Sequence, residues 1–422
     1  MKKVYISIYE YACERRELDA QKIHNFLSAS SYSIVSKPQL ADIIIFITCG
    51  IIEKNTESCL QYIKKYQKYG AQLIVGGCGP GIDKERIQAI HKGAMFTTSD
   101  MRALDSLFPD QAVPFSSIDD APFKFSMLDK GIFGSIMTKI MFRIPCAQKL
   151  FKTIVRTILN RRFGPYSFLS LKAVGLDNEY YIKIADGCVS QCSYCALSNA
   201  IGPLKSKPIA SCLAEFTRGL EQGYTNFYLT GDDTGAYGID CGHTLPDVLE
   251  EITSVQGTYN LLISSFNSAW LCTYIDRIES LVTNGRIKSM VIPVQSGNSE
   301  VLTAMNRFSD VATIKDAVTR IKKACPDIWL STHIIVGFPT ESDSAFYDTL
   351  TFATTTPFDE VQLFAFSLKP GTKAQDITPR ISEASIAARM NKARDFFKKN
   401  KYTCYMHKTD FLYASQYKAP RL

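Results

Sequence analysis

Three cysteines, Cys188, Cys192 and Cys195, are separated by three and then two residues in one short stretch of this 422-residue chain. Thiolates are soft ligands that suit iron–sulfur clusters, and this close spacing lets one loop wrap one corner of a cluster. Four cysteines would close a four-iron cluster, whereas three leave one iron open to bind a substrate or a cofactor. The alternative is three ordinary buried thiols, since free cysteine often packs in protein cores. The spacing favours the cluster.

Three further cysteines, Cys13, Cys49 and Cys78, each come just after a short apolar run in residues 1–110. The apolar runs lie at 4–9, 43–48 and 72–75, with helical stretches at 16–28 and 52–67. Short strands alternating with helices predict a parallel sheet covered by helices, a Rossmann-like α/β domain. Because ligands gather at the carboxyl ends of such strands, we expect the three thiolates to converge at that edge.

From residue 179 onward the chain alternates strand and helix six times. The predicted strands lie at 180–185, 226–231, 260–265, 289–295, 329–337 and 360–366. The predicted helices lie at 208–222, 245–255, 271–284, 311–324 and 342–355. Six such units predict an incomplete parallel barrel, an open (β/α)6 partial TIM barrel, with active-site groups on loops at the carboxyl ends of its strands. The Cys188 loop follows the first strand, as this geometry requires.

Cysteine content and hydropathy bear on the compartment. Thirteen cysteines, an odd number scattered along a chain that shows no signal peptide, do not suit a secreted disulfide framework. A reducing cytosol and metal ligation explain them better. The sequence holds no apolar run of the roughly 18 residues needed to span a bilayer. We therefore expect a soluble, cytoplasmic protein with no membrane span. We also expect a monomer.

Positive charge is concentrated in two segments of a chain whose net charge is +7. Residues 124–172 hold ten Lys/Arg and one acid, and residues 389–422 hold nine Lys/Arg and two acids, so the rest of the chain is mildly acidic. Such segments attract polyanions or anionic surfaces, although two solvated helix faces would look the same. The first segment also has apolar residues that would suit a lid, a peptide-binding cap or a helix lying on a membrane. They are Ile132, Phe133, Ile136, Ile140, Met141 and Ile144.

The spacing at 188–195 strongly resembles the signature of the radical S-adenosylmethionine (SAM) enzymes. Seven segments resemble, in order, the methylthiotransferases of that family: Ile182–Cys188, Leu204–Pro208, Leu229–Gly238, Pro293–Asn298, Met305–Arg307, Ile335–Glu341 and Pro370–Thr372. The contexts Ala12-Cys13, Thr48-Cys49 and Gly77-Cys78 resemble the family's amino-terminal cysteine sites. The resemblance covers residues 1–110 and 176–375. One Gly-rich strand end would be weak evidence, but seven segments in order with both cysteine trios are specific.

The resemblance implies two 4Fe-4S clusters and SAM as cofactors. The catalytic cluster would be held by Cys188, Cys192 and Cys195, with SAM chelating its open iron and being split to a 5′-deoxyadenosyl radical. An auxiliary cluster that supplies or relays sulfur would be held by Cys13, Cys49 and Cys78. An electron donor such as flavodoxin or ferredoxin would reduce the enzyme.

Further positions would contact SAM. Tyr194 is suited to pack on the adenine, because aromatic rings stack on flat bases. Gly231 and Asp232 would meet the amino group, since glycine allows close backbone approach and a carboxylate suits an ammonium. Gln295 and Ser296 would hydrogen-bond the ribose or carboxylate, while Val336 and Gly337 would pass beneath the adenine. The alternative is that these residues only shape the turns after strands.

The chain departs from the family pattern at three places. Ile47 and Arg16 stand where the family usually has asparagine near the auxiliary cysteines, which alters the surroundings of that cluster. Ile201 stands where the family usually has arginine, which removes a bidentate anion contact.

The segment Asp233–Gly238 most resembles the subfamily that modifies N6-threonylcarbamoyladenosine at tRNA position 37, and predicts methylthiolation at C2 of that base. Such enzymes usually end in a β-rich TRAM domain, whereas the residues after Gly371 look helical and then irregular. The basic segments would replace it in binding RNA. Methylthiolation of a peptide or ribosomal-protein side chain is the alternative, and a non-catalytic iron–sulfur or RNA-binding protein is a third.

The predicted domains are 1–110, a basic linker or cap at 111–175, the radical SAM core at 176–380 and a basic tail at 381–422.

Overall fold

The computed structural model describes residues 1–29, 32–120, 145–169, 171 and 178–416. The chain divides into two compact units. The N-terminal unit comprises Met1–Phe123, Ala185–Ser206 and Ser367–Gln375, and the barrel unit comprises the remaining residues. The segment with Cys188, Cys192 and Cys195 therefore belongs to the N-terminal unit, not to the unit that contains the barrel strands.

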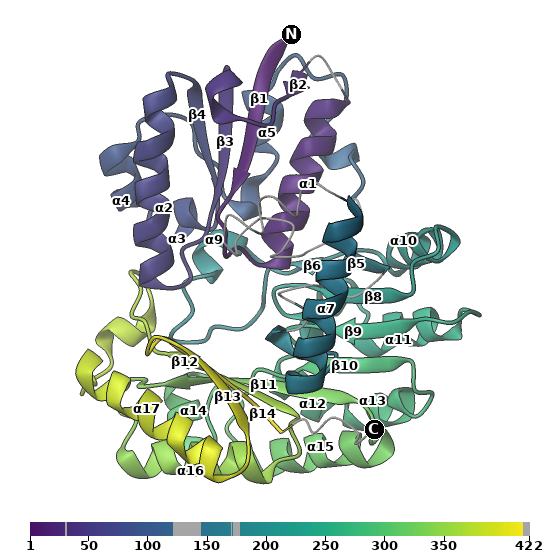
Figure 1. The fold of residues 1–422 in the computed structure, drawn as a ribbon, viewed down its shortest axis with the longest axis vertical. Helices are drawn as coiled ribbons and strands as arrows, with labels where there is room; N and C mark the ends of the chain where they lie inside the picture. Colours follow the sequence, from purple (N-terminus) through teal and green to yellow (C-terminus); the bar gives the residue numbers. More distant parts are fainter. Residues whose placement is uncertain (30–31, 121–144, 170, 172–177, 417–422) are drawn as a thin grey trace. The chain divides into compact units, whose positions relative to one another are not determined.

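The N-terminal unit is built on a parallel sheet of order β2-β1-β3-β4 (Figure 1). Its strands are β1 (Lys2–Ile8), β2 (Tyr32–Ile34), β3 (Ile43–Thr48) and β4 (Gln72–Gly77). Its helices are α1 (Glu14–Ser28), α2 (Glu53–Tyr66), α3 (Gly79–Ile82), α4 (Lys84–Ile90), α5 (Ala103–Leu107) and α9 (Ser198–Ile201). The predicted three strands and two helices are confirmed. The three-residue β2 was not predicted, because so short a run shows no clear periodicity.

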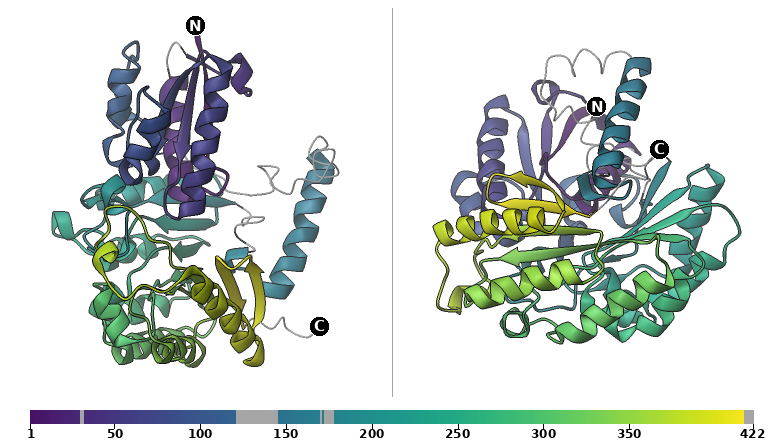
Figure 2. Two further views of the ribbon diagram at one scale, coloured as in Figure 1. Left: turned by 90° about the vertical axis from the view of Figure 1, so that its left-hand side faces the viewer. Right: turned by 60° about the horizontal axis from the view of Figure 1, so that its bottom comes forward.

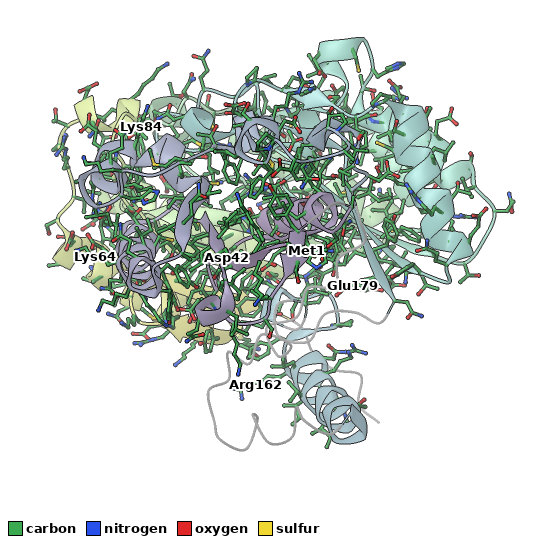
Figure 3. The ribbon with its side chains drawn as sticks, turned by 90° about the horizontal axis from the view of Figure 1, so that it is seen from above. Met1, Asp42, Lys64, Lys84, Arg162 and Glu179 are labelled. Carbon is green, nitrogen blue, oxygen red and sulfur yellow. The ribbon has the colours of Figure 1, made fainter. Side chains whose placement is uncertain are left out.

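Two apolar cores lie on opposite faces of this sheet. One core joins the sheet to α1 and α5 through Phe26, Leu104 and Phe108. The other joins it to α2 and α4 through Cys59, Ile63 and Ile87. All six residues of β3 are buried, which is typical of a central parallel strand that helices cover on both faces. The charged side chains of Lys64 on α2 and Lys84 at the start of α4 are exposed, as Figure 3 shows.

The barrel unit contains an eight-stranded sheet of order β13-β14-β12-β11-β10-β9-β8-β5 (Figure 2). Six strands are parallel: β5 (Glu179–Lys183), β8 (Asn226–Thr230), β9 (Asn260–Ile263), β10 (Ile287–Val291), β11 (Trp329–Val336) and β12 (Glu360–Ala365). The helices are α7 (Pro145–Phe163), α10 (Ile209–Glu221), α11 (Leu245–Ser254), α12 (Ser268–Thr273), α13 (Ile275–Val282), α14 (Ser299–Ala304), α15 (Val311–Ala324), α16 (Asp343–Thr355) and α17 (Glu383–Lys399). The predicted open barrel of six parallel strands is confirmed. The single helix predicted at 271–284 is instead the pair α12 and α13, broken at Tyr274.

The prediction of an irregular tail is wrong for residues 403–415. These residues form a hairpin of β13 (Thr403–His407) and β14 (Phe411–Ser415), and β14 pairs antiparallel with β12. Leu412, Tyr413 and Ala414 are buried there. Pairing with a distant strand stabilises the hairpin, so local sequence gave little sign of it.

The predicted apolar lid residues at 132–144 lie outside the described residues. In the described part of the chain, no helix is long and apolar enough to cross a membrane.

Glu360 on β12 is buried beneath the hairpin and gives a testable pH dependence. Its Oε2 accepts hydrogen bonds from the Trp329 indole at 3.3 Å and from the Phe168 backbone at 2.9 Å. Burial raises the pKa of Glu360 from 4.5 to about 7 despite these donors. The folded protein therefore binds the Glu360 proton more tightly than the unfolded chain does. This contribution to the free energy of unfolding is fully present below pH 4.5 and is lost as the pH rises through about 7.

In the Trp270→Phe variant, Trp329 is the sole tryptophan of a chain that has two. Its fluorescence should titrate with a midpoint near the raised pKa of Glu360, because ionisation places a negative charge beside the indole. The same variant with Glu360→Gln added is the control and should give a flat profile. A titration that survives Glu360→Gln would refute the assignment.

Candidate active site

Cys13, Cys49 and Cys78 lie at the carboxyl edge of the N-terminal sheet. Cys13 is the N-cap of α1, Cys49 directly follows β3, and Cys78 follows β4 and precedes α3. The backbone N–H of Cys78 donates to the carbonyl of Thr48 at 3.2 Å, so the loops after β3 and β4 adjoin. Burial raises the pKa of the Cys49 thiol, and Cys13 lies close enough to raise it further. The three cysteines therefore follow three neighbouring strands at one edge of the sheet, and the convergence of their thiolates on a cluster stays a prediction.

Arg16 lies among these thiols with only 2% of its surface exposed. Its Nη1 is 3.8 Å from Cys78 Sγ, and its Nε is 3.2 Å from Asp19 Oδ2. Its charge also acts to lower the pKa of Cys49. The Asn55 side-chain amide donates to Cys49 Sγ at 3.4 Å. A buried cation and an amide donor directed at sulfur fit thiolates that carry the negative charge of a bound cluster.

Within the described ranges, no three Cys, His, Asp or Glu side chains surround a point where a single metal ion would bind. A four-iron cluster differs because each thiolate binds a different iron, so its ligands stand around a body rather than a point.

The Cys188 loop is closed at its base by the short antiparallel pair β6 (Ala185–Asp186) and β7 (Lys205–Ser206). Gly187, directly before the first cysteine, has φ 79°, and a Cβ there would lie 2.1 Å from the Pro203 carbonyl oxygen. Only glycine fits this turn. The Ser190 backbone N–H donates to Cys188 Sγ at 3.2 Å.

Cys188, Cys192 and Cys195 are all partly exposed, and Tyr194 is partly exposed between two of them. The loop therefore presents three partly exposed cysteines from one short segment, which fits a three-cysteine cluster that leaves an iron open.

The two cysteine loops pack on each other within the N-terminal unit. Cys78 and Ile82 share one apolar cluster with Ala196 and Ala200, the residues that follow Cys195. A Cβ on Gly81 would lie 2.6 Å from the Ala200 Cα, so α3 and α9 approach at backbone distance. The Thr98 hydroxyl donates to the Ala200 carbonyl at 2.7 Å. Sequence inspection missed this packing, although the small residues in both segments are a sign of close approach.

The predicted SAM-contacting positions of the barrel unit lie at or just beyond the carboxyl ends of its strands. Gly231 and Asp232 directly follow β8, and Val336 ends β11 with Gly337 after it. Gln295 has φ 80°, and its backbone bridges to β11 through hydrogen bonds with His333 and Ile335. These positions share one edge of the sheet, as predicted.

The Ser296 hydroxyl, predicted to hydrogen-bond SAM, has partners within the barrel unit. It is fully buried, lies 3.0 Å from the Thr349 hydroxyl on α16, and accepts from the Asn298 backbone N–H at 3.2 Å. The side chain thus holds the strand-to-helix turn against α16. The sequence could not reveal this contact because Thr349 lies 53 residues away.

Sequence reasoning did not single out a buried polar group at the same edge. Asp233 is 3% exposed, and its Oδ2 accepts from the Trp270 indole at 3.2 Å. Burial raises the pKa of Asp233, while the nearby Arg307 charge lowers it. The Nη2 of Arg307 in turn donates to the Asn267 side chain at 3.1 Å. Asp233 and Arg307 both fall in segments that resemble the family, and this resemblance was the signal in the sequence that could have identified them.

Arg389, a residue of the basic tail, is buried against the barrel. Arg389 on α17 is 8% exposed and forms an ion pair with Glu341 at 2.8 Å. Burial raises the pKa of Glu341 to about 7, although the Gly337 N–H and Arg389 oppose the shift. Arg389 is therefore part of the barrel core rather than of a solvated basic surface.

Comparison with known proteins agrees with this site. Residues 182–353 match the family model described as the radical SAM superfamily, and residues 3–98 match uncharacterized protein family UPF0004. A probable threonylcarbamoyladenosine tRNA methylthiotransferase of Pyrococcus abyssi is 26% identical over 376 residues, covering 89% of this chain and 79% of that protein. The ribosomal protein uS12 methylthiotransferase RimO of Syntrophotalea carbinolica is 28% identical over 406 residues, covering 93% and 80%.

Among solved structures, the radical SAM methyltransferase TsrM of Kitasatospora setae, with tryptophan and a SAM analogue bound, aligns with a TM-score of 0.59. The alignment covers 93% of this chain and 77% of TsrM at 11% identity, which supports the fold alone. The cofactors of this enzyme class are SAM and 4Fe-4S clusters, two of them in the methylthiotransferases. With both cysteine trios in place on this fold, the chain belongs to the radical SAM methylthiotransferase family.

Proposed function

We propose that the chain binds its two clusters through the two cysteine trios and inserts a methylthio group at an unactivated C–H carbon. Cys188, Cys192 and Cys195 would hold the cluster that binds SAM, and Cys13, Cys49 and Cys78 would hold the auxiliary cluster. The observation that carries this proposal is the shared core of Cys78, Ala196 and Ala200, which belongs to both cysteine loops. When bound, the clusters and SAM supply the radical and the sulfur; side-chain acids and bases cannot break such a C–H bond.

The protein's own residues would bind and orient these groups. The partly exposed Tyr194 would stack on the adenine of SAM. Gly231, Asp232, Gln295, Val336 and Gly337 would line the binding edge of the barrel unit, with Asp232 facing the ammonium. Asp233 and Arg307 would hold the turn beneath that edge, since both are engaged in hydrogen bonds there.

For the substrate we favour tRNA, with methylthiolation at C2 of N6-threonylcarbamoyladenosine 37. The Pyrococcus relative carries that activity in its name, and segment Asp233–Gly238 resembles the same subfamily. An exposed basic surface at the end of α17 and the start of the hairpin supports RNA binding, because clustered Lys side chains bind phosphates. It is formed by Lys398, Lys399 and Lys401.

Methylthiolation of a ribosomal-protein side chain is the second candidate, because the RimO relative aligns over 93% of this chain. The two are separated by incubating the anaerobically reconstituted enzyme, SAM and a reductant with tRNA bearing threonylcarbamoyladenosine or with uS12 protein. Mass spectrometry of the nucleosides and peptides should find the methylthio group on the nucleoside only. Its appearance on uS12 only would reverse the assignment.

A further inference from the structure

Residues Ser367–Gln375, here called the strap, run between the two cysteine loops within the N-terminal unit. At one end of the strap, the Ser367 hydroxyl accepts a hydrogen bond from the Glu53 backbone N–H at 3.1 Å. Glu53 begins α2, the helix that follows Cys49. At the other end, the Ala374 N–H donates to the carbonyl of Ser193 at 2.8 Å. Ser193 lies between Cys192 and Cys195, so the strap connects one ligand loop with the other.

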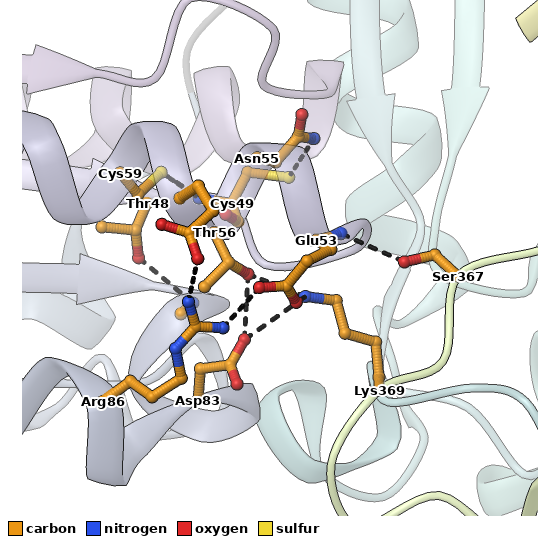
Figure 4. A network of polar contacts seen from close by, with 12 residues as sticks. Thr48, Cys49, Glu53, Asn55, Thr56, Cys59, Asp83, Arg86, Ser367 and Lys369 are labelled. Atoms are coloured by element: carbon orange, nitrogen blue, oxygen red, sulfur yellow. Dashed lines mark hydrogen bonds and ion pairs between the residues drawn. The ribbon is translucent and has the colours of Figure 1, made fainter. Parts of the chain in front are cut away.

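Lys369 anchors the strap at its auxiliary end. Its side chain is 1% exposed, and its Nζ donates to Glu53 Oε2 at 2.9 Å and to Thr56 Oγ1 at 2.8 Å (Figure 4). Asp83 Oδ2 lies 3.4 Å from the same nitrogen and accepts from the Thr56 hydroxyl at 2.9 Å. A buried lysine in contact with three partners holds its position far more tightly than a surface ion pair does.

These partners come from the segments that follow two of the three auxiliary cysteines, Cys49 and Cys78. Glu53 and Thr56 are on the helix that follows Cys49, and Asp83 lies just beyond α3, the helix that follows Cys78. Figure 4 shows Thr56, Asp83 and Glu53 converging on the Lys369 ammonium. One side chain of the strap therefore ties together the segments after two auxiliary cysteines.

The strap also contacts the Cys188 loop at several points. Besides the bond from Ala374, Lys373 Nζ donates to the Gln191 side chain at 3.4 Å. A Cβ on Gly371 would lie 3.3 Å from the Asn199 amide on α9, so the middle of the strap also follows that loop closely. Moving the strap would shift Ser193 and with it the ligands on either side.

We propose that Lys369 is a positioning residue that fixes the distance between the two cluster-binding loops through the strap. This inference rests on the proposed function, because it assigns Lys369 a part in transfer between the two sites. Each loop would keep its own cluster without Lys369, since the partners of its ammonium are Glu53, Thr56 and Asp83 rather than the proposed cluster ligands. Only steps that need both sites would suffer, because a displacement of about 1 Å can slow a reaction about 100-fold.

The test compares Lys369→Met with wild type as the anaerobically reconstituted holoenzyme. Iron per chain and cleavage of SAM to 5′-deoxyadenosine should stay within about twofold of wild type, while methylthio product should fall at least about tenfold. Lys369→Arg should restore most of the product, because a guanidinium can reach the same acids. Lys322→Met, which removes a partly buried lysine paired with Asp359 in the barrel unit, is the matched control and should leave product unchanged.

A second readout needs no substrate. The magnetic interaction between the two reduced clusters, measured by electron paramagnetic resonance, should weaken in Lys369→Met and recover in Lys369→Arg. Should Lys369→Met fold poorly, Glu53→Gln removes one acid from the same lysine and should weaken the interaction to a lesser degree. Unchanged magnetic interaction and product in these variants would overturn the proposal. Absence of methylthio product in wild type on every substrate would instead count against the proposed function, and the magnetic readout would still decide the role of Lys369.

Discussion

Joint replacement of Cys13, Cys49 and Cys78 by alanine is expected to abolish methylthio transfer while SAM cleavage to 5′-deoxyadenosine continues. The physical reason is that these thiols stand apart from the Cys188 loop in the sequence and follow their own three strands. Cys78 packs against the other loop, and alanine keeps part of its apolar surface there. Cysteine to alanine at three positions removes every proposed ligand of one cluster and none of the other.

The measurement is product and 5′-deoxyadenosine from the same reaction, analysed by liquid chromatography and mass spectrometry. Cys59→Ala is the control, because Cys59 lies in α2 beside Cys49 and is assigned to packing. It should cost some stability and leave transfer in place. Methylthio product from the triple variant at the wild-type rate would contradict the assignment of the auxiliary site.

Gly187→Ala is expected to remove the cluster of the Cys188 loop nearly as completely as loss of a ligand. The position has φ 79°, which costs about 1–2 kcal/mol for a residue with a Cβ. The added carbon would also lie 2.1 Å from the Pro203 carbonyl oxygen, a backbone atom two residues before β7. The turn that directs Cys188 would therefore be lost.

Iron analysis and SAM cleavage test this variant together. Iron should fall by about half, since one of two four-iron clusters is lost, and 5′-deoxyadenosine should fall to background. Gly223→Ala is the matched control: this glycine also has positive φ, of 85°, but its Cβ would meet nothing within 4 Å. It should retain full iron. Full iron and activity in Gly187→Ala would show that the turn is not needed to form the site.

The parts of the site that local sequence specifies could be predicted. Cys188, Cys192 and Cys195 are recognisable because their close spacing lets one loop supply all three ligands. Cys13, Cys49 and Cys78 are recognisable because each follows an apolar strand. The six parallel strands follow from short apolar runs between helices. In each case the signal lies within about ten residues of the feature it predicts.

Contacts between distant segments could not be predicted. Arg16 beside Cys78 looked like a departure from a pattern, and only the fold shows it as a buried cation among thiols. Lys369 is 313 residues from Thr56, and nothing near either residue indicates the contact. The hairpin at 403–415 depends on β12 for its partner, so its own sequence looked irregular. Tertiary pairing overrides local preference in each case.

Iron per chain in the anaerobically reconstituted protein tests the central claim most directly, that two cysteine trios each hold a four-iron cluster. The wild type should bind about eight irons, and alanine at either trio, 13/49/78 or 188/192/195, should leave about four. About four irons in both wild type and the Cys13/Cys49/Cys78 variant would contradict the claim. The chain would then hold one cluster, and methylthio transfer would lack its second site.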